Sequence, residues 1–159
     1  LIKAGYSAGM ADALARYDEG QPILFYTWTP NWTVYKLKPG EDVMWINVPE
    51  INPNEGQKGS EDRMVVSDLK GAVTDPIKLG FIAADIQMVA NKKFAEENPA
   101  AKRFFELFTI PLADVSKQNA KMNSGEDSAK DIQRHAQEWI QENQEMVQGW
   151  LEEARAAAE

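Results

Sequence analysis

The residues best suited to binding chemistry lie in one aromatic stretch, residues 25–32, with the sequence Phe-Tyr-Thr-Trp-Thr-Pro-Asn-Trp. Trp28 ends a predicted strand there and precedes the predicted start of a helix. Ligands of open α/β sheets bind in the crevice outside the carboxyl ends of the strands. An indole face is the best neutral surface for a cation, and a desolvated contact contributes about 2 kcal/mol. Trp28 is therefore a candidate wall of a pocket for an organic cation.

Core packing is the competing interpretation of these aromatic residues. Trp28 and Trp32 are four residues apart, and the pattern alone favours packing for Trp28 while leaving ligand contact open. For the remaining large aromatic side chains, packing is clearly the stronger interpretation. These residues are Phe25, Tyr26, Trp45, Trp139 and Trp150.

The sequence gives little support for a catalytic site. Adjacent acidic pairs such as Glu61-Asp62 lie in predicted turns or on helix surfaces, where nothing separates their pKa values for acid–base work. The only histidine, His135, is expected on a helix surface or at a cap. Neither a Gly-x-Ser-x-Gly elbow nor a glycine-rich phosphate loop is present. We therefore assign no catalytic residue, metal ligand or cofactor, and keep a small hydrolase using loop carboxylates as a competing interpretation.

Composition narrows the classes of protein further. The 159 residues suit one domain or two small lobes. A hydrophobic share of 43% excludes wholesale disorder. The net charge of −8 disfavours nucleic acids and anionic lipid surfaces as partners. The absence of cysteine excludes thiol nucleophiles and disulfides. Because the sequence begins at Leu1 without an initiator methionine, we expect it to be a piece of a longer polypeptide.

Residues 1–48 alternate between predicted helices and strands, which favours the α/β class. The first helix is predicted over residues 1–20 with Ser7 as its N-cap, because apolar side chains recur every three or four positions: Tyr6, Met10, Leu14 and Tyr17. A continuous apolar run predicts a strand over residues 23–28, buried on both faces. Thr29-Pro30 is predicted to open a short helix, and a second strand follows over residues 43–48.

The second half of the sequence is predicted to be mainly helical. Residues 49–80 have the composition of turns, so we expect a surface excursion, with Met64-Val65-Val66 as an alternative edge strand. Residues 85–91 alternate like a half-buried strand. Four helices are expected after residue 92, the last over residues 128–157 with both Trp139 and Trp150 on its apolar face. The change in pattern near Asn91 predicts the boundary between two packing units.

Several short segments together resemble the substrate-binding proteins of glycine betaine/proline betaine ABC importers. The most specific is Tyr-Thr-Trp-Thr-Pro-Asn-Trp, residues 26–32. Weaker segments follow in the right order, and the Trp150 helix completes the match. They are Leu-Lys-Pro-Gly-Glu-Asp-Val (37–43), Val-Ala-Asn-Lys (89–92), Asn-Pro-Ala-Ala (98–101) and Asp-Ile-Gln (131–133). The resemblance covers about the C-terminal half of such a protein.

The resemblance implies an α/β, type II periplasmic-binding-protein-like two-lobe fold. Residues 1–91 then correspond to the latter part of the second lobe, and residues 92–159 to helices that return to complete the first lobe. The family holds a quaternary ammonium in a box of tryptophans, and Trp28 falls on one of them, which favours ligand contact for this residue. The other box tryptophans and the carboxylate anchors fall outside this sequence, and neither Trp32 nor Trp45 matches a box position.

The function implied is non-enzymatic binding of glycine betaine or a related quaternary ammonium osmolyte for an ABC transporter permease. The implied location is periplasmic, or extracellular and membrane-associated. An α/β interaction module that associates with a second chain, and binds no ligand alone, is the alternative from another class. Unpaired sheet edges and apolar helix faces would be covered by that second chain.

Overall fold

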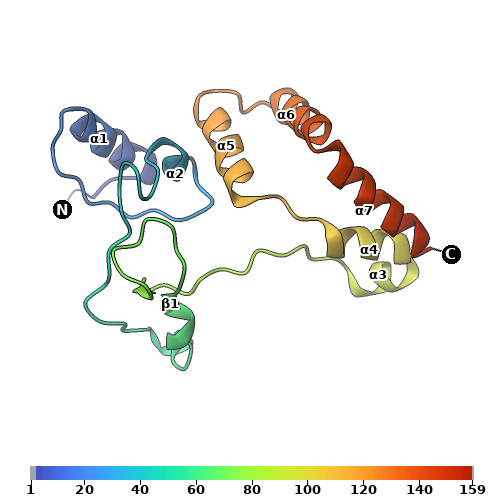
Figure 1. The fold of residues 1–159 in the computed structure, drawn as a ribbon, viewed down its shortest axis with the longest axis horizontal. Coiled ribbons are helices and arrows are strands. Elements are labelled where there is room, and N and C mark those ends of the chain that lie inside the picture. Colours follow the sequence, from blue (N-terminus) through green and yellow to red (C-terminus); the bar gives the residue numbers. More distant parts are fainter. Residues whose placement is uncertain (1–2, 159) are drawn as a thin grey trace.

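The computed structural model describes residues 3–158, which are mostly helical and arranged in an N-terminal and a C-terminal group joined by extended segments (Figure 1). The N-terminal group holds α1 (Tyr6–Asp18), α2 (Trp32–Lys36), the 3-10 helices η1 (Glu55–Gln57) and η2 (Glu61–Met64), and the strands β1 (Val65–Val66) and β2 (Ile77–Lys78). The later helices are α3 (Lys92–Glu97), α4 (Pro99–Leu107), α5 (Leu112–Asn123), α6 (Ala129–Glu142) and α7 (Gln144–Ala156).

The first predicted helix is confirmed as α1, although residues 1–2 of the predicted range lie outside the described residues. Its expected apolar stripe faces inward, with Met10 only 2% exposed. The predicted N-cap was wrong, because Gly5 occupies that position and no side chain caps the helix. The amide of Gly9 donates to the Gly5 carbonyl, so the first turn begins before Ser7.

The two strands predicted over residues 23–28 and 43–48 are extended segments rather than strands of a buried sheet. Within residues 3–158, no backbone hydrogen bond pairs residues 23–28 with another segment. Their side chains alternate between half-buried and exposed, and Leu24 is 82% exposed. The Trp45 amide donates to the Gly71 carbonyl over 2.8 Å in an isolated bridge. A strand is stabilised by its neighbours, and the local apolar pattern did not specify them.

Residues 49–80 are more than the surface excursion that their composition predicts. The alternative edge strand is confirmed as β1, which pairs antiparallel with β2 in the register Val66 to Ile77. Met64 and Ile77 are both fully buried and are the largest fully buried apolar side chains described. This turn-rich segment therefore supplies core residues of the N-terminal group, because its few apolar residues point inward together.

A close backbone approach fastens this segment to the turn at residues 39–43. Gly71 has a φ of +80°, and a Cβ built on it would overlap the Gly40 nitrogen and lie 2.5 Å from the Pro39 carbonyl carbon. Gly40 itself has a φ of +86°. Only glycine combines this backbone conformation with this proximity.

The short helices of the C-terminal group agree with their predicted positions, whereas the strand predicted over residues 85–91 is absent. Those residues are extended and exposed, and Val89 is 91% exposed. They form part of the long connection between the two groups (Figure 1). An alternating apolar pattern forms a half-buried strand only where another segment covers one of its faces. No described segment covers either face of residues 85–91.

The helix predicted over residues 128–157 is broken into α6 and α7 at Asn143. The Trp139 carbonyl accepts both the Asn143 backbone amide at 3.0 Å and the Asn143 side-chain amide at 2.9 Å, so Asn143 caps the end of α6. The break also brings together Trp139 and Trp150, whose rings stack at 6.3 Å and 24°. In a straight helix, residues eleven apart are separated by about 16 Å along the axis.

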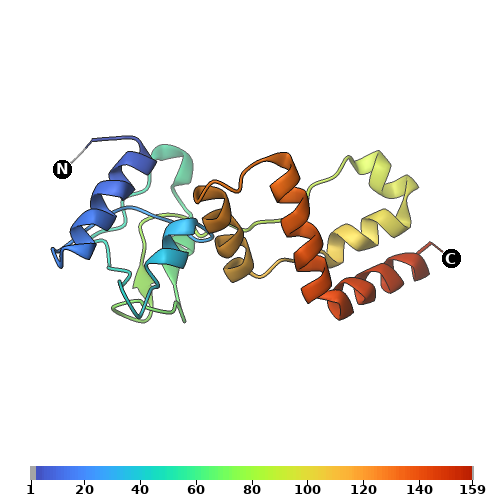
Figure 2. The same cartoon turned by 90° about the horizontal axis from the view of Figure 1, so that it is seen from above.

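Two helix contacts organise the arrangement seen in Figures 1 and 2. The antiparallel neighbours α4 and α7 pack together, with Phe104 and Phe108 both against Trp150. The helix α5 instead packs on α2 of the N-terminal group. None of the described helices has the length and apolar composition needed to cross a membrane.

Candidate functional site

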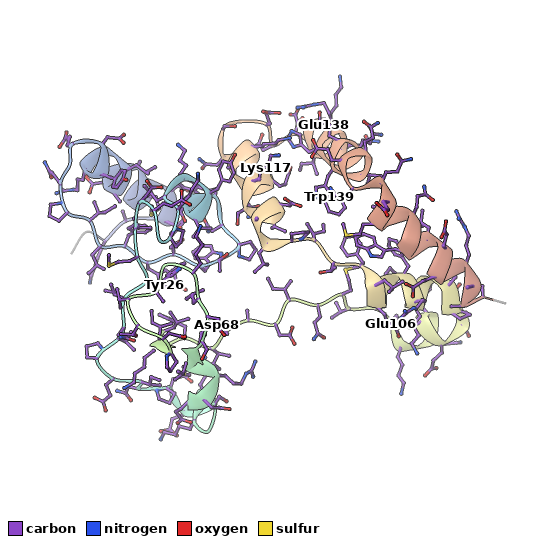
Figure 3. All side chains as sticks on the ribbon, in the orientation of Figure 1. Tyr26, Asp68, Glu106, Lys117, Glu138 and Trp139 are labelled. Atoms are coloured by element: carbon purple, nitrogen blue, oxygen red, sulfur yellow. The ribbon has the colours of Figure 1, made fainter. Side chains whose placement is uncertain are left out.

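Trp28 forms a row with three other aromatic side chains, two of which come from distant parts of the sequence. The Tyr6 ring lies 4.8 Å from the indole, the Tyr26 ring 5.9 Å, and Phe81 continues the row at 5.2 Å from Tyr26. We call these four residues the aromatic cluster. They come from α1, the extended segment 23–28 and the connection after β2. Tyr26 lies between α1 and α2 on one side and the region of β1 on the other (Figure 3).

The aromatic cluster is open to solvent. Trp28 is 45% exposed, Tyr26 58% and Phe81 59%. Trp28 is thus not sealed among aliphatic neighbours, and its indole offers surface to a ligand. The expectation that Tyr26 belongs to the core was wrong, because the extended segment has no second layer over that side. Phe25 is half-buried.

The turn after Trp28 is organised by Asn31. Its side-chain oxygen accepts hydrogen bonds from the Thr33 amide at 3.0 Å and from the Thr33 hydroxyl at 3.1 Å. Asn31 is therefore the N-cap of α2, and the predicted cap and first-turn roles of Thr29-Pro30 were wrong. That peptide bond is cis and lies before the helix. Because Asn31 and Thr33 are both buried, the end of the segment that carries Trp28 is fixed to α2.

The other tryptophans lie away from this open surface. Trp150 is 8% exposed, and Trp139 is half-buried, so their predicted packing role is confirmed. Trp139 points from α6 toward α5, where its indole nitrogen donates to Asp114 over 2.9 Å (Figure 3). Trp45 is half-buried in its bridge, and Trp32 is half-buried with the Lys36 ammonium 5.9 Å from its ring.

The single histidine is buried, contrary to the expected helix-surface position. His135 is 4% exposed, and its Nε2 lies 2.9 Å from a Glu126 carboxylate oxygen that also accepts from Arg134 over 2.6 Å. The bend before α6 folds residues 124–128 back over the histidine, a contact that a helical periodicity cannot reveal. Its Nδ1 has no hydrogen-bond partner among the described residues.

The carboxyl groups of the described residues are not arranged for general acid catalysis. Such an acid needs a raised pKa, whereas each carboxyl with a clear change has a lowered pKa. Hydrogen bonding to Lys70 lowers the pKa of Glu41, and hydrogen bonding to Arg134 lowers the pKa of Glu126. No group of three or more potential metal-ligating side chains converges anywhere in residues 3–158.

The carboxylates around Arg134 predict a specific acid sensitivity of α6. Hydrogen bonds to Arg134, Ser128 and Lys121 hold the pKa values of Glu126, Asp131 and Glu138 below their usual range. A lowered folded-state pKa stabilises the fold above the unfolded-state value and is lost as pH falls through the folded one. We therefore expect Arg134→Gln to lower the urea midpoint, followed by circular dichroism at 222 nm, more at about pH 5 than at about pH 3.

Arg155→Gln is the matched control for this prediction, since Arg155 lies on α7 and has no ion pair within the described part of the chain. Its midpoint difference from the parent is expected to be small and independent of pH. An Arg134→Gln effect of equal size at both pH values would contradict the assigned ion pairs.

The sequence pattern identified Trp28, with Tyr26 two residues away, but did not bring Tyr6 or Phe81 to this site. Tyr6 was recognised only as part of the apolar stripe of α1, and Phe81 was not singled out. No local signal could have joined them, because 22 positions separate Tyr6 from Trp28 and 53 separate Trp28 from Phe81. Only chain folding brings them into contact.

Comparison with known proteins matches residues 1–142 to the family model described as the substrate binding domain of ABC-type glycine betaine transport system. The chain is 42% identical over 156 residues to the glycine betaine-binding periplasmic protein OusX of Dickeya dadantii. It is 41% identical over 155 residues to the glycine betaine/proline betaine-binding periplasmic protein of Escherichia coli. It is also 41% identical over 152 residues to the protein of that description in Salmonella typhimurium.

These alignments cover nearly all of this chain but less than half of each relative. They include 98% of the chain for the first two relatives and 96% for the third. The corresponding shares of the relatives are 44%, 44% and 43%. The chain therefore spans about two fifths of the length of the proteins that it matches.

Proposed function

Because the chain belongs to the family of substrate-binding domains of ABC-type glycine betaine transport systems, we propose that it is a solute-binding part of an ABC importer. Its ligand is glycine betaine or a related quaternary ammonium osmolyte, and no bond is made or broken. It delivers this ligand to a membrane permease. Its place of action is the periplasm, or the outer face of the membrane, in line with the periplasmic descriptions of the relatives.

The observation that carries this proposal is the half-exposed indole of Trp28 within the aromatic cluster. A quaternary ammonium cannot donate a hydrogen bond, so ordinary polar groups recognise it poorly. The electron-rich face of an indole attracts such a cation electrostatically. Trp28 is 45% exposed, and its indole is flanked by the rings of Tyr6 and Tyr26.

The proposal includes a two-lobe arrangement around the ligand. In it, residues 1–91 form the latter part of the second lobe, and residues 92–159 form helices that complete the first. The family resemblance supports this arrangement, and the packing of α5 on α2 places the two ranges in direct contact. Lobe closure would exclude water from the indole and strengthen the cation contact.

The ligand role of Trp28 can be tested by titrating glycine betaine while following the tryptophan indole resonances. We expect a saturable shift of the Trp28 signal in the millimolar range or above, because one half-exposed ring contributes only about 0.5–1 kcal/mol. Trp28→Ala should weaken binding about two- to fivefold, and Trp28→Phe less. In a longer polypeptide that contains this chain and closes over the ligand, the loss should approach about 30-fold, or about 2 kcal/mol.

Two controls make this test decisive. Glycine carries a hydrated primary ammonium in place of the methylated one and should leave the Trp28 signal unchanged. Trp32→Phe removes a half-buried indole four residues away and should leave the affinity for glycine betaine unchanged. Equal affinity of the parent and Trp28→Ala would contradict the proposed role.

A second candidate is an interaction module that associates with another chain and binds no ligand alone. The exposed extended segments favour it, because they carry apolar side chains and lack strand partners within residues 3–158. The most exposed are Leu24 at 82%, Ile86 at 68% and Val89 at 91%. Light scattering of the purified chain distinguishes the candidates: association without any response to glycine betaine supports the module, and a monomer that responds supports the solute-binding part.

A further inference from the structure

The Tyr6 ring lies too close to Trp28 to be the opposite wall of a cation cage. The two ring centroids are 4.8 Å apart, with an angle of 40° between the rings. A cation bound by an aromatic face lies within about 6 Å of the ring centroid, in van der Waals contact with the face. A cation between two rings therefore needs a much larger separation than 4.8 Å. Tyr6 instead covers part of the indole itself.

The Tyr6 hydroxyl is held in a triangle with two threonines. It lies 2.9 Å from the Thr27 hydroxyl oxygen and 3.1 Å from that of Thr33, and the two threonine oxygens are 2.5 Å apart. Thr33 donates its hydroxyl proton to Asn31, so within the triangle its oxygen only accepts. The protons of Tyr6 and Thr27 therefore supply hydrogen bonds along two of the three sides. Three elements are joined in this way: the first turn of α1, the residue before Trp28, and α2.

This triangle is anchored in the interior of the protein. Thr33 is 1% exposed and Asn31 is 5% exposed, so water does not compete for their hydrogen bonds. Tyr6 is half-buried and is fixed at both ends, by the tilted contact of its ring with Trp28 and by hydrogen bonding at its hydroxyl. A ring held in this way restricts the orientations that the neighbouring indole can adopt.

We infer that Tyr6 is a positioning residue for Trp28: it covers one part of the indole and holds the rest in a single orientation toward a methylated ammonium. This inference rests on the proposed function of Trp28. Preorganisation of this kind increases affinity because the ordering of the ring is not left to the binding step. The inference assigns Tyr6 no contact with the ligand.

The test uses the chain labelled with 5-fluorotryptophan, in which each indole gives its own fluorine resonance and Trp28→Phe identifies that of Trp28. We expect Tyr6→Leu to displace and broaden the Trp28 resonance and to weaken glycine betaine binding, but by less than Trp28→Ala does. Tyr6→Phe keeps the ring but removes its hydroxyl, and should displace the same resonance less. The Trp139 and Trp150 resonances should stay in place, which reports that the helical group remains folded.

Tyr35→Leu is the matched control, since Tyr35 is 46% exposed on α2 and forms no aromatic pair among the described residues. It should leave the Trp28 resonance unchanged. An unmoved Trp28 resonance in both Tyr6 variants would overturn the inference, even where glycine betaine still binds through Trp28. A displaced resonance together with no response of the parent to glycine betaine would support positioning and refute the proposed function instead.

Discussion

Replacing Trp150 with alanine is expected to lower the free energy of unfolding of the helical group by about 3–5 kcal/mol. The side chain is 8% exposed and contacts three aromatic rings, two from α4 and its C-cap and one from α6. Phe104 lies edge-on at 6.3 Å, Phe108 at 5.6 Å, and Trp139 is stacked at 6.3 Å. Truncation removes these contacts and leaves a cavity that the surrounding rings cannot fill.

Urea unfolding followed by circular dichroism at 222 nm measures this loss, because α3 to α7 contain most of the helical residues described. Phe94→Ala is the control, since Phe94 is 45% exposed on α3 and belongs to no aromatic pair within residues 3–158. Its cost should be about 1 kcal/mol or less. Equal losses in the two variants would show that Trp150 is not the centre of the helical packing.

Replacing Gly71 with alanine is expected to cost about 2–4 kcal/mol in the N-terminal group. The new methyl group would overlap the Gly40 nitrogen and lie 2.5 Å from the Pro39 carbonyl carbon. Both atoms belong to the backbone, so neither can move aside as the end of a flexible side chain would. The φ of +80° adds strain for any residue with a Cβ atom.

Gly59→Ala separates the two contributions to this effect. Gly59 has a φ of +85°, but a Cβ atom added there would meet nothing within 4 Å, so only the backbone strain applies. Its cost should be about 1–2 kcal/mol. Thermal unfolding followed by the fluorescence of the N-terminal tryptophans compares the two variants. A Gly71→Ala effect no larger than that of Gly59→Ala would mean that the approach of the two turns is not tight.

Trp28 shows how far local reasoning reaches toward the candidate site. The aromatic stretch identified the residue and its place before a helix, and the structure leaves its ring open to solvent. The expected strand was wrong, because the alternation of half-buried and exposed side chains reflects an extended chain without a neighbour. The cap of α2 was also misplaced, since both Thr29 and Asn31 have suitable side chains and only the folded turn selects Asn31.

For His135 and Asn143, the helical pattern did not predict the structural role of the residue. Helical periodicity places His135 next to Arg134 and Ala136 on a helix, but the chain before α6 folds back and buries it against Glu126. In the sequence, Asn143 is one polar residue within a long helical pattern. In the structure it is the C-cap of α6, and its side-chain amide donates to the Trp139 carbonyl. In both cases the outcome depends on a hydrogen-bond partner that a periodic pattern does not specify.

The amino-acid sequence by itself determined the family, the inward stripe of α1, the positions of α3 to α5, and the choice of Trp28. These features depend on residue types and on short spacings between residues, so the local sequence is sufficient to predict them. The tertiary structure decided which extended segments found hydrogen-bond partners, where the last helix broke, and that Tyr6 lies against Trp28. Contacts between residues far apart in the chain form only when it closes on itself, so no local pattern encodes them.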